Sequence, residues 1–517
     1  MKILVKNWKN FKANPDIWFF YGFLLTCTFS IRKVLFFYPI DGQFNEYTGI
    51  YLYLSDIFLV LALLSWVLTI LYNNETLLSN IPTRLRKMFH VEHFNGKYNW
   101  LILIPLILVI WSFISLIWSD NRFLALFRSL KLAEFYLLYI YIIYQIVPRG
   151  TILRNTFRII IVIGIFQSIL GLAQFVLQHS VGLVWLRESQ IGPDIPGVAK
   201  LIFGGEKIIR AYGAFPHPNI MGGFLLFSIL VTYLYPRMFH VEHSTENRPG
   251  DLSIKAYCQA SRLLLLFVFI QLLALLTTFS KSAVLCLLVA AAYITYHTIV
   301  PRGTINLPSL IKLFHVEQFG RKLLLICGII LALGLIFKPD TNSLLFKSLN
   351  ERLFYLSVSH GTILANPIIG VGNGQFVLDL SKYVPRGTIV QDWQYQPVHN
   401  VFLLIWSELG IIGLVIFLWL LWQLFHVEQS IAKPAVKCST WNNDGCEVYE
   451  PIGHTNVPRG TFLTKRHFLV FLKGLFLGLI FIMLFDHYLW DIQQGEILLW
   501  LLFGLLAGQC FHTIDIC

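Results

Sequence analysis

Long apolar stretches alternate with polar connections along almost the whole chain. Each stretch is about 20 residues long, which is the length that an α-helix needs to cross the hydrocarbon core of a bilayer. We expect about twelve such spans, near 17–37, 50–72, 100–118, 124–146, 155–177, 217–236, 261–279, 282–298, 322–337, 400–424, 467–485 and 496–511. The pattern predicts an all-α polytopic membrane protein, with residues 1–517 in a single integral membrane domain and a large loop between the ninth and tenth spans.

The composition agrees with this class. Of the 517 residues, 56% are hydrophobic and 13% are charged, whereas a soluble protein carries about a quarter charged residues. The mean hydropathy is +0.65. The formal net charge of +12 reports topology in a membrane protein, so we expect the lipid bilayer and no nucleic acid as a partner. The eight cysteines suggest no disulfide framework.

Lysine and arginine predict the orientation of the chain. The N-terminal tail contains Lys2, Lys6, Lys9 and Lys12, which places it in the cytoplasm by the positive-inside rule. The connections 38–49 and 486–495 then face outward, and neither holds a Lys or an Arg. The same orientation leaves two long outward segments, 179–214 and the large loop 338–399.

Short peptides recur along the chain in three forms. Phe-His-Val-Glu stands at 89–92, 239–242, 314–317 and 425–428, Val-Pro-Arg-Gly-Thr at 147–151, 300–304, 384–388 and 457–461, and Cys-Ser-Thr-Trp-Asn at 438–442. All three are frames of one DNA palindrome, TGTTCCACGTGGAACA, so we interpret them as nine copies of an inserted DNA element. Eight copies lie in expected cytoplasmic connections, where insertions are tolerated, and we expect them to have little meaning for the protein. Their paired histidines are therefore not interpreted as metal ligands.

Three polar residues of the outward face suggest chemistry. Arg210 precedes the span at 217–236, and its guanidinium suits a bidentate phosphate contact. Lys281 lies in a very short connection, where a cation is costly unless it reaches the interface or meets an anion. His399 begins a span, and a half-wet imidazole suits proton transfer near neutral pH. The plainer alternatives are an interfacial anchor for Arg210 and an ordinary histidine at a helix start for His399.

Two further groups of polar residues stand near the same face. Glu408 lies below His399 in the expected span, and Asp486-His487-Tyr488 begins the last outward turn. Each could equally be a satisfied polar group inside a helix bundle. We assign them no role from the sequence.

Four motifs together resemble the O-antigen ligase and polymerase superfamily. They are Arg-x-x-Gly-x-Phe-x-His-Pro-Asn at 210–219, Thr-x-Ser-Lys-Ser-Ala at 278–283, the stretch from Arg352 to Gly372 with Asn-Pro-x-x-Gly-x-Gly, and His399-Asn400-x-Phe-Leu followed by Glu408-Leu-Gly and Gly413. The similar region covers roughly 200–420. The family usually has an Arg where Lys281 stands.

The resemblance implies a metal-independent, inverting membrane glycosyltransferase. Its donor would be a glycan on a polyprenyl pyrophosphate and its acceptor a saccharide, both at the outer face of a bacterial inner membrane, with 338–399 as a large periplasmic loop. The implied catalytic base is His399. The implied substrate-binding residues are Arg210, Lys281, Arg352, His217, Asn219 and Asn400. We expect no metal site and no cofactor.

Two alternatives stay open. A polymerase of the same superfamily would join lipid-linked repeat units instead of transferring a glycan to a lipid core or another acceptor. A polysaccharide transporter or flippase would also suit about twelve spans. Against a transporter, the second half of the chain does not repeat the motifs of the first half, as repeat-built transporters tend to do.

Overall fold

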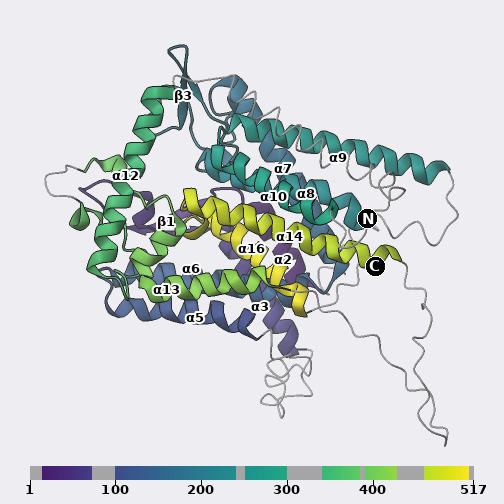
Figure 1. Cartoon of the computed structure of the whole chain (residues 1–517), viewed down its shortest axis with the longest axis horizontal. Coiled ribbons are helices and arrows are strands. Elements are labelled where there is room, and N and C mark those ends of the chain that lie inside the picture. Colours follow the sequence, from purple (N-terminus) through teal and green to yellow (C-terminus); the bar gives the residue numbers. More distant parts are fainter. Residues whose placement is uncertain are drawn as a thin grey trace, which may run out of the picture.

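The fold is a bundle of helices that run roughly side by side (Figure 1). The computed structural model describes residues 14–72, 99–239, 251–299, 341–384, 390–427 and 459–511. Its α-helices are α2 (Pro15–Thr26), α3 (Leu54–Tyr72), α5 (Trp100–Ile114), α6 (Arg122–Tyr141), α7 (Gly150–Leu177), α8 (Pro218–Phe239), α9 (Asp251–Thr277), α10 (Lys281–Ile299), α12 (Thr341–Ala365), α13 (Val401–Phe425), α14 (Arg459–Phe485), α15 (Tyr488–Asp491) and α16 (Gln493–Phe511).

Seven of the helices within these ranges are long and apolar enough to cross a membrane. Their apolar segments are Leu54–Leu71, Trp100–Ile117, Gly150–Leu177, Pro218–Tyr235, Val401–Phe425, His467–Phe485 and Gln493–Phe511, and two shorter ones are Leu263–Thr277 and Lys281–His297. The fold is thus that of a multi-pass membrane protein. The expected span 322–337 lies outside the described residues, and the count of twelve stays a prediction.

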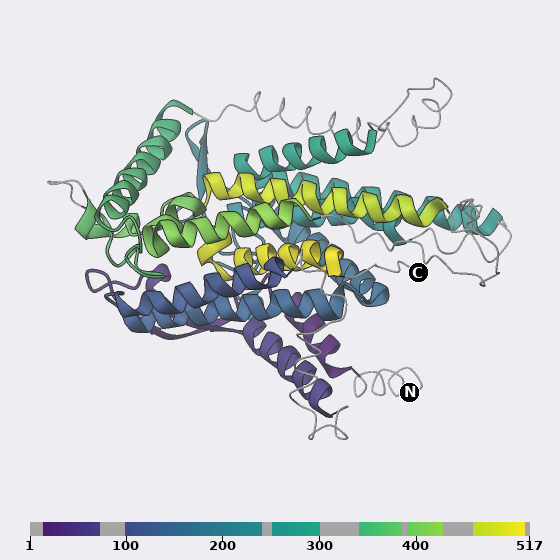
Figure 2. The ribbon, with the colours of Figure 1, turned by 60° about the horizontal axis from the view of Figure 1, so that its bottom comes forward.

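Helix α16 forms the centre of the bundle. Of its apolar segment, 94% is buried, which is typical of a helix that is hydrophobic on all sides. Two glycines allow the close packing: a Cβ at Gly504 would lie 2.8 Å from Ile142, and one at Gly508 would lie 2.6 Å from Val147. Figure 2 shows α16 enclosed by neighbouring helices on both sides.

The expected span 17–37 is wrong in its second half. Helix α2 ends at Thr26, and strand β1 (Arg32–Phe37) then pairs antiparallel with β2 (Gly49–Tyr53). Two adjacent cations, Arg32 and Lys33, interrupt the apolar run. The guanidinium of Arg32 bonds Glu46 at 2.7 Å and lies over the ring of Tyr51 at 4.3 Å. This pairing keeps the arginine at the hairpin and outside a helical span.

A second hairpin occupies the segment 179–214. Strands β3 (Lys200–Phe203) and β4 (Glu206–Ile209) pair across a turn at Gly204 and Gly205. The all-α expectation therefore holds for the bundle and misses two small hairpins.

Part of the expected loop 338–399 is helical. Helix α12 stands at an angle to the bundle, at its left edge in both ribbon views (Figure 2). It buries Tyr355, Val358, Ser359 and Thr362, whose spacing of three and four residues forms one face of a helix. That face covers the start of α13, since Ser359 and Ser407 share a hydrogen bond of 3.0 Å.

The glycine-rich segment 366–374 supports a break in α13. Gly410 leaves the helical conformation at φ 69° and ψ −175°, and the freed backbone pairs with the segment. Gly372 N donates to Glu408 O at 2.8 Å, and Ile411 N donates to Pro367 O at 3.0 Å. These bonds satisfy the polar backbone groups that an interrupted helix exposes.

We expect Gly410→Ala to destabilise the protein strongly. A Cβ there would lie 2.1 Å from Ile368 O, in a backbone conformation that costs a non-glycine residue about 1–3 kcal/mol by itself. The matched control is Gly204→Ala, because Gly204 also has a positive φ of +57° but has no atom within 4 Å of its missing Cβ. The apparent melting temperature in detergent should fall much further for Gly410→Ala. Equal shifts would contradict the tight contact.

Two copies of the recurring peptides belong to the packed fold. In the copy at 147–151, Val147 is fully buried and follows a π-helical turn, Ile142–Ile146. In the copy at 425–428, Val427 is 1% exposed. The expectation that copies in the connections have little meaning for the protein is therefore wrong for these two.

Candidate functional site

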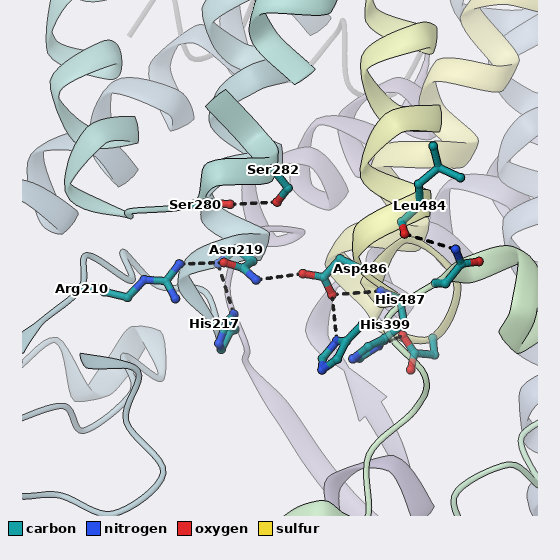
Figure 3. Close-up of polar contacts among 11 residues, drawn as sticks. Arg210, His217, Asn219, Ser280, Ser282, His399, Leu484, Asp486 and His487 are labelled. Atoms are coloured by element: carbon teal, nitrogen blue, oxygen red, sulfur yellow. Dashed lines mark hydrogen bonds and ion pairs between the residues drawn. The ribbon is translucent and has the colours of Figure 1, made fainter. Parts of the chain in front are cut away.

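Polar side chains from distant parts of the sequence meet at one end of the bundle (Figure 3). The chain reaches this end where α8 and α13 begin and where α14 ends. We call Arg210, Asn219, His399, Asp486 and His487 the polar network. Arg210 directly follows β4, and the other four members lie at or next to helix ends. The fold therefore brings them together although more than 270 residues separate Arg210 from His487.

Two buried glutamines of α7 hold the segment that follows Arg210. Gln174 Oε1 accepts from Gly213 N at 2.8 Å, and Gln167 Oε1 accepts from Ala214 N at 2.8 Å. Gly213 has a φ of +60°, and a Cβ on it would lie 2.6 Å from Gln167 Oε1. The glycine of the sequence motif is thus required by this close approach.

Arg210 is fixed by two hydrogen bonds. Its Nε donates to Thr278 O at 2.6 Å, and its Nη2 donates to Asn219 Oδ1 at 2.7 Å. Burial lowers the pKa of Arg210 to about 10, so the guanidinium stays positive at neutral pH. Among the described residues, the structure shows no hydrogen bond of its Nη1.

Asn219 joins the cation to a buried carboxylate. Its Nδ2 donates to Asp486 Oδ2 at 2.9 Å, while its own backbone N–H donates to His217 Nδ1 at 3.2 Å. Burial, helped by the charge of Arg210, lowers the pKa of His217 to about 3. His217 is therefore a neutral acceptor that orients Asn219.

Asp486 faces two imidazoles. Its Oδ1 accepts from His487 N at 2.9 Å and lies 3.8 Å from His399 Nδ1. Burial alone would raise the pKa of Asp486, but the imidazole of His399 facing its Oδ1 and the positive charge of His487 hold it well below its usual range. A carboxylate on the Nδ1 side selects the tautomer of His399 that leaves Nε2 unprotonated.

The side chain of His399 is partly accessible. It is 29% exposed, and its ring meets Tyr355 of α12 edge-on at 5.5 Å. The next residue, Asn400, accepts from Leu403 N at 3.0 Å as the cap of α13 and donates to Leu484 O at 3.2 Å. Asn400 was expected to bind substrate, and the structure gives its amide these positioning contacts.

His487 has a carboxylate of its own. Its Nδ1 bonds Asp491 Oδ1 at 2.9 Å, and Arg128 Nη1 donates to Asp491 O at 2.9 Å. Burial would lower the pKa of His487, but the charge and hydrogen bond of Asp491 raise it overall. The ring of His487 also lies 5.1 Å from that of His399.

The other two expected cations lie outside the network. Lys281 is exposed at the first residue of α10, and its neighbour Ser280 packs 3.0 Å from the Cβ position of Gly222 in α8. Arg352 is exposed on α12. The structure shows neither side chain bonded to the network in the described part of the chain, and their roles stay predictions.

Sequence reasoning assigned no role to Asp486 or His487, although both are members of the polar network and contact its other residues. No spacing motif links them to His399, because 86 residues lie between His399 and Asp486. One group of side chains at this site bears on the expectation of no metal site. His399, Asp486 and His487 each offer one ligand atom, and these atoms lie within 4.8 Å of one another.

The family comparison bears on the region around His399. Residues 266–418 match the family model described as O-antigen ligase. The resemblance to the O-antigen ligase superfamily is thereby confirmed. The O-antigen ligase match includes Lys281, Arg352 and His399, and it supports a membrane protein that handles glycans. A search of the curated proteins finds no match to the chain.

The raised pKa of His487 predicts a pH-dependent contribution to stability. A folded pKa above the unfolded value of about 6.5 means that the contribution is fully present below about pH 6.5 and is lost as pH rises through the folded value. The gap in apparent melting temperature between wild type and His487→Gln should therefore narrow from about pH 6 to about pH 9. Exposed His360→Gln is the control and should follow wild type. A gap that widens with pH would contradict the pairing with Asp491.

Proposed function

We propose that this protein is an O-antigen-ligase-like glycosyltransferase. It moves a glycan from a polyprenyl pyrophosphate onto a saccharide acceptor at the outer face of a bacterial inner membrane, with the N-terminus in the cytoplasm. The observation that carries the proposal is the path from Arg210 through Asn219 to Asp486, which two hydrogen bonds form, and the imidazole of His399 that faces Asp486 at 3.8 Å. It places a permanent cation and a candidate base at one end of the bundle, where a lipid pyrophosphate would lie.

His399 acts as the general base of a single displacement. Its Nε2 takes the proton of the acceptor hydroxyl while that oxygen bonds the anomeric carbon. The bond from the anomeric carbon to the pyrophosphate oxygen breaks, and the electron pair leaves with the lipid pyrophosphate. Attack from the face opposite the leaving group inverts the anomeric centre. Asp486 faces Nδ1 at 3.8 Å and stabilises the imidazolium that forms.

The leaving group requires positive charge. Arg210 offers Nη1, and Lys281 adds an ammonium from the start of α10, with Arg352 as a third candidate. Fixed cations at a developing negative charge stabilise the transition state without the cost of reorganising solvent. Side chains supply this charge in our proposal, so the chemical step needs no metal ion. His217 and Asn219 hold Arg210 in position.

A reconstituted assay separates the alternatives. Proteoliposomes would receive a lipid-linked glycan donor together with either a lipid-core acceptor or a second lipid-linked unit. A ligase forms product with the first acceptor, and a polymerase lengthens the lipid-linked glycan. A transporter or flippase moves the donor and forms no glycosidic bond, which would overturn the enzymatic proposal.

His399→Ala should lower kcat by about 10²–10⁴-fold, because a positioned general base contributes roughly that much. Donor binding should change little, since the base acts mainly in the transition state. Asp486→Asn should lower kcat less and change the pH–rate profile, because an amide no longer selects the tautomer of His399. The control is His426→Ala, an exposed residue at the end of α13. Full activity of His399→Ala would contradict the mechanism.

Two substitutions test the cations. Arg210→Ala should weaken both donor binding and turnover, because it removes a ligand of the pyrophosphate and the partner of Asn219. Lys281→Ala should reduce turnover severely, whereas Lys281→Arg should be mild because it keeps the charge and the family usually carries Arg there. Donor binding and single-turnover rates measure the two effects separately. Normal turnover of Lys281→Ala would remove this residue from the site.

A further inference from the structure

The spacing in the polar network suits a metal ion as well as a hydrogen bond. His399 Nδ1 and Asp486 Oδ1 lie 3.8 Å apart, which is longer than a normal hydrogen bond of about 2.9 Å. Two ligands of a tetrahedral zinc ion with bonds of about 2.0 Å lie about 3.3 Å apart. Together with His487, the three ligand atoms lie within 4.8 Å of one another, so a bound ion would have to draw them closer to reach tetrahedral spacing. This is the single such group among the residues that the structure describes.

Outer hydrogen bonds already orient two of the three ligands. Asp491 holds Nδ1 of His487 at 2.9 Å, which leaves Nε2 as the nitrogen for a metal ion. Asn219 holds Oδ2 of Asp486 at 2.9 Å, which leaves Oδ1 facing the imidazoles. A carboxylate behind a ligating histidine and a donor on a ligating carboxylate are the usual support of a metal site.

The donor set selects the kind of ion. Two imidazoles and one carboxylate suit zinc and similar transition metals, whereas magnesium prefers oxygen ligands. Three protein ligands leave one tetrahedral position open. The exposed side of His399 gives access from outside the bundle.

We propose that His399, Asp486 and His487 bind Zn²⁺ and that the bound ion switches off glycan transfer. The second half of this inference rests on the proposed function. When zinc takes the lone pair at Nδ1 of His399, the single proton of the neutral ring moves to Nε2. That nitrogen can then accept no proton from the acceptor hydroxyl. Zinc also occupies the Asp486 oxygen that would stabilise the imidazolium.

The binding half is tested on the full-length protein in detergent. After treatment with a chelator, the protein is titrated with Co²⁺, whose absorption spectrum reports tetrahedral nitrogen and oxygen ligands, and bound Zn²⁺ is measured by mass spectrometry. We expect His399→Ala and His487→Ala each to lose one equivalent of tightly bound metal relative to wild type. Exposed His360→Ala and His426→Ala are the controls and should keep it, because other histidines of the chain contribute equally in every variant.

Asp491→Asn tests the site without removing a ligand. Losing an outer carboxylate should weaken the affinity for Zn²⁺ about 10–100-fold, and gel filtration shows whether each variant keeps its fold. Unchanged metal content and an unchanged Co²⁺ spectrum in both His399→Ala and His487→Ala would overturn the site.

The inhibitory half is tested by activity. Buffered Zn²⁺ should stop transfer by the wild-type protein, a chelator should restore it, and the same concentration of Mg²⁺ should have no effect. Transfer that requires Zn²⁺, or that is unaffected at saturating Zn²⁺, would overturn inhibition. If no transfer occurs under any condition, the proposed function fails, while the Co²⁺ titration still decides the metal site.

Discussion

The buried carboxylate of Asp486 constrains the whole end of the bundle at which it lies. An ionised carboxylate out of water is unfavourable unless charges and hydrogen bonds compensate it. Here the compensation comes from Asn219 at the start of α8, His399 before α13 and the His487 backbone after α14. The low pKa of Asp486 shows that these partners outweigh burial. Three helix ends must therefore meet around one side chain, and the geometry of the site follows from that requirement.

Hydropathy predicted most of the bundle because crossing a bilayer demands long apolar helices. The expected span 400–424 is α13 at Val401–Phe425, and 467–485 is the apolar part of α14. Hydropathy could not predict strand β1, because Val34 to Phe37 are as apolar as a helical span and the ion pair of Arg32 with Glu46 decides the outcome. Nor could it show that Gly410 breaks α13, since the partner backbone at 367–372 lies in a different segment.

The candidate site was predictable only where residues stand in local motifs. Arg210, His217 and Asn219 lie within ten residues, and Asn219 bonds both of the others, Arg210 through its side chain and His217 through its backbone N–H. His399 and Asn400 are also adjacent, but the amide of Asn400 caps α13 and bonds Leu484. The acid that faces His399 is Asp486, which lies far later in the sequence, just after the end of α14. Such a pairing depends on how helices pack, and no spacing within one motif encodes it.

The neutral side chain of Asn219 lies between Arg210 and Asp486, so one network contains a cation and an anion that do not form a direct ion pair. A direct ion pair in this buried place would bind the guanidinium and the carboxylate tightly to each other. The arginine would then lose much of its attraction for a pyrophosphate, and the acid would lose its influence on the imidazole. Asn219 accepts from the cation and donates to the anion through opposite ends of its amide. It thus fixes both groups while keeping them apart, as the proposed mechanism requires if Arg210 is to face the leaving group while Asp486 orients His399.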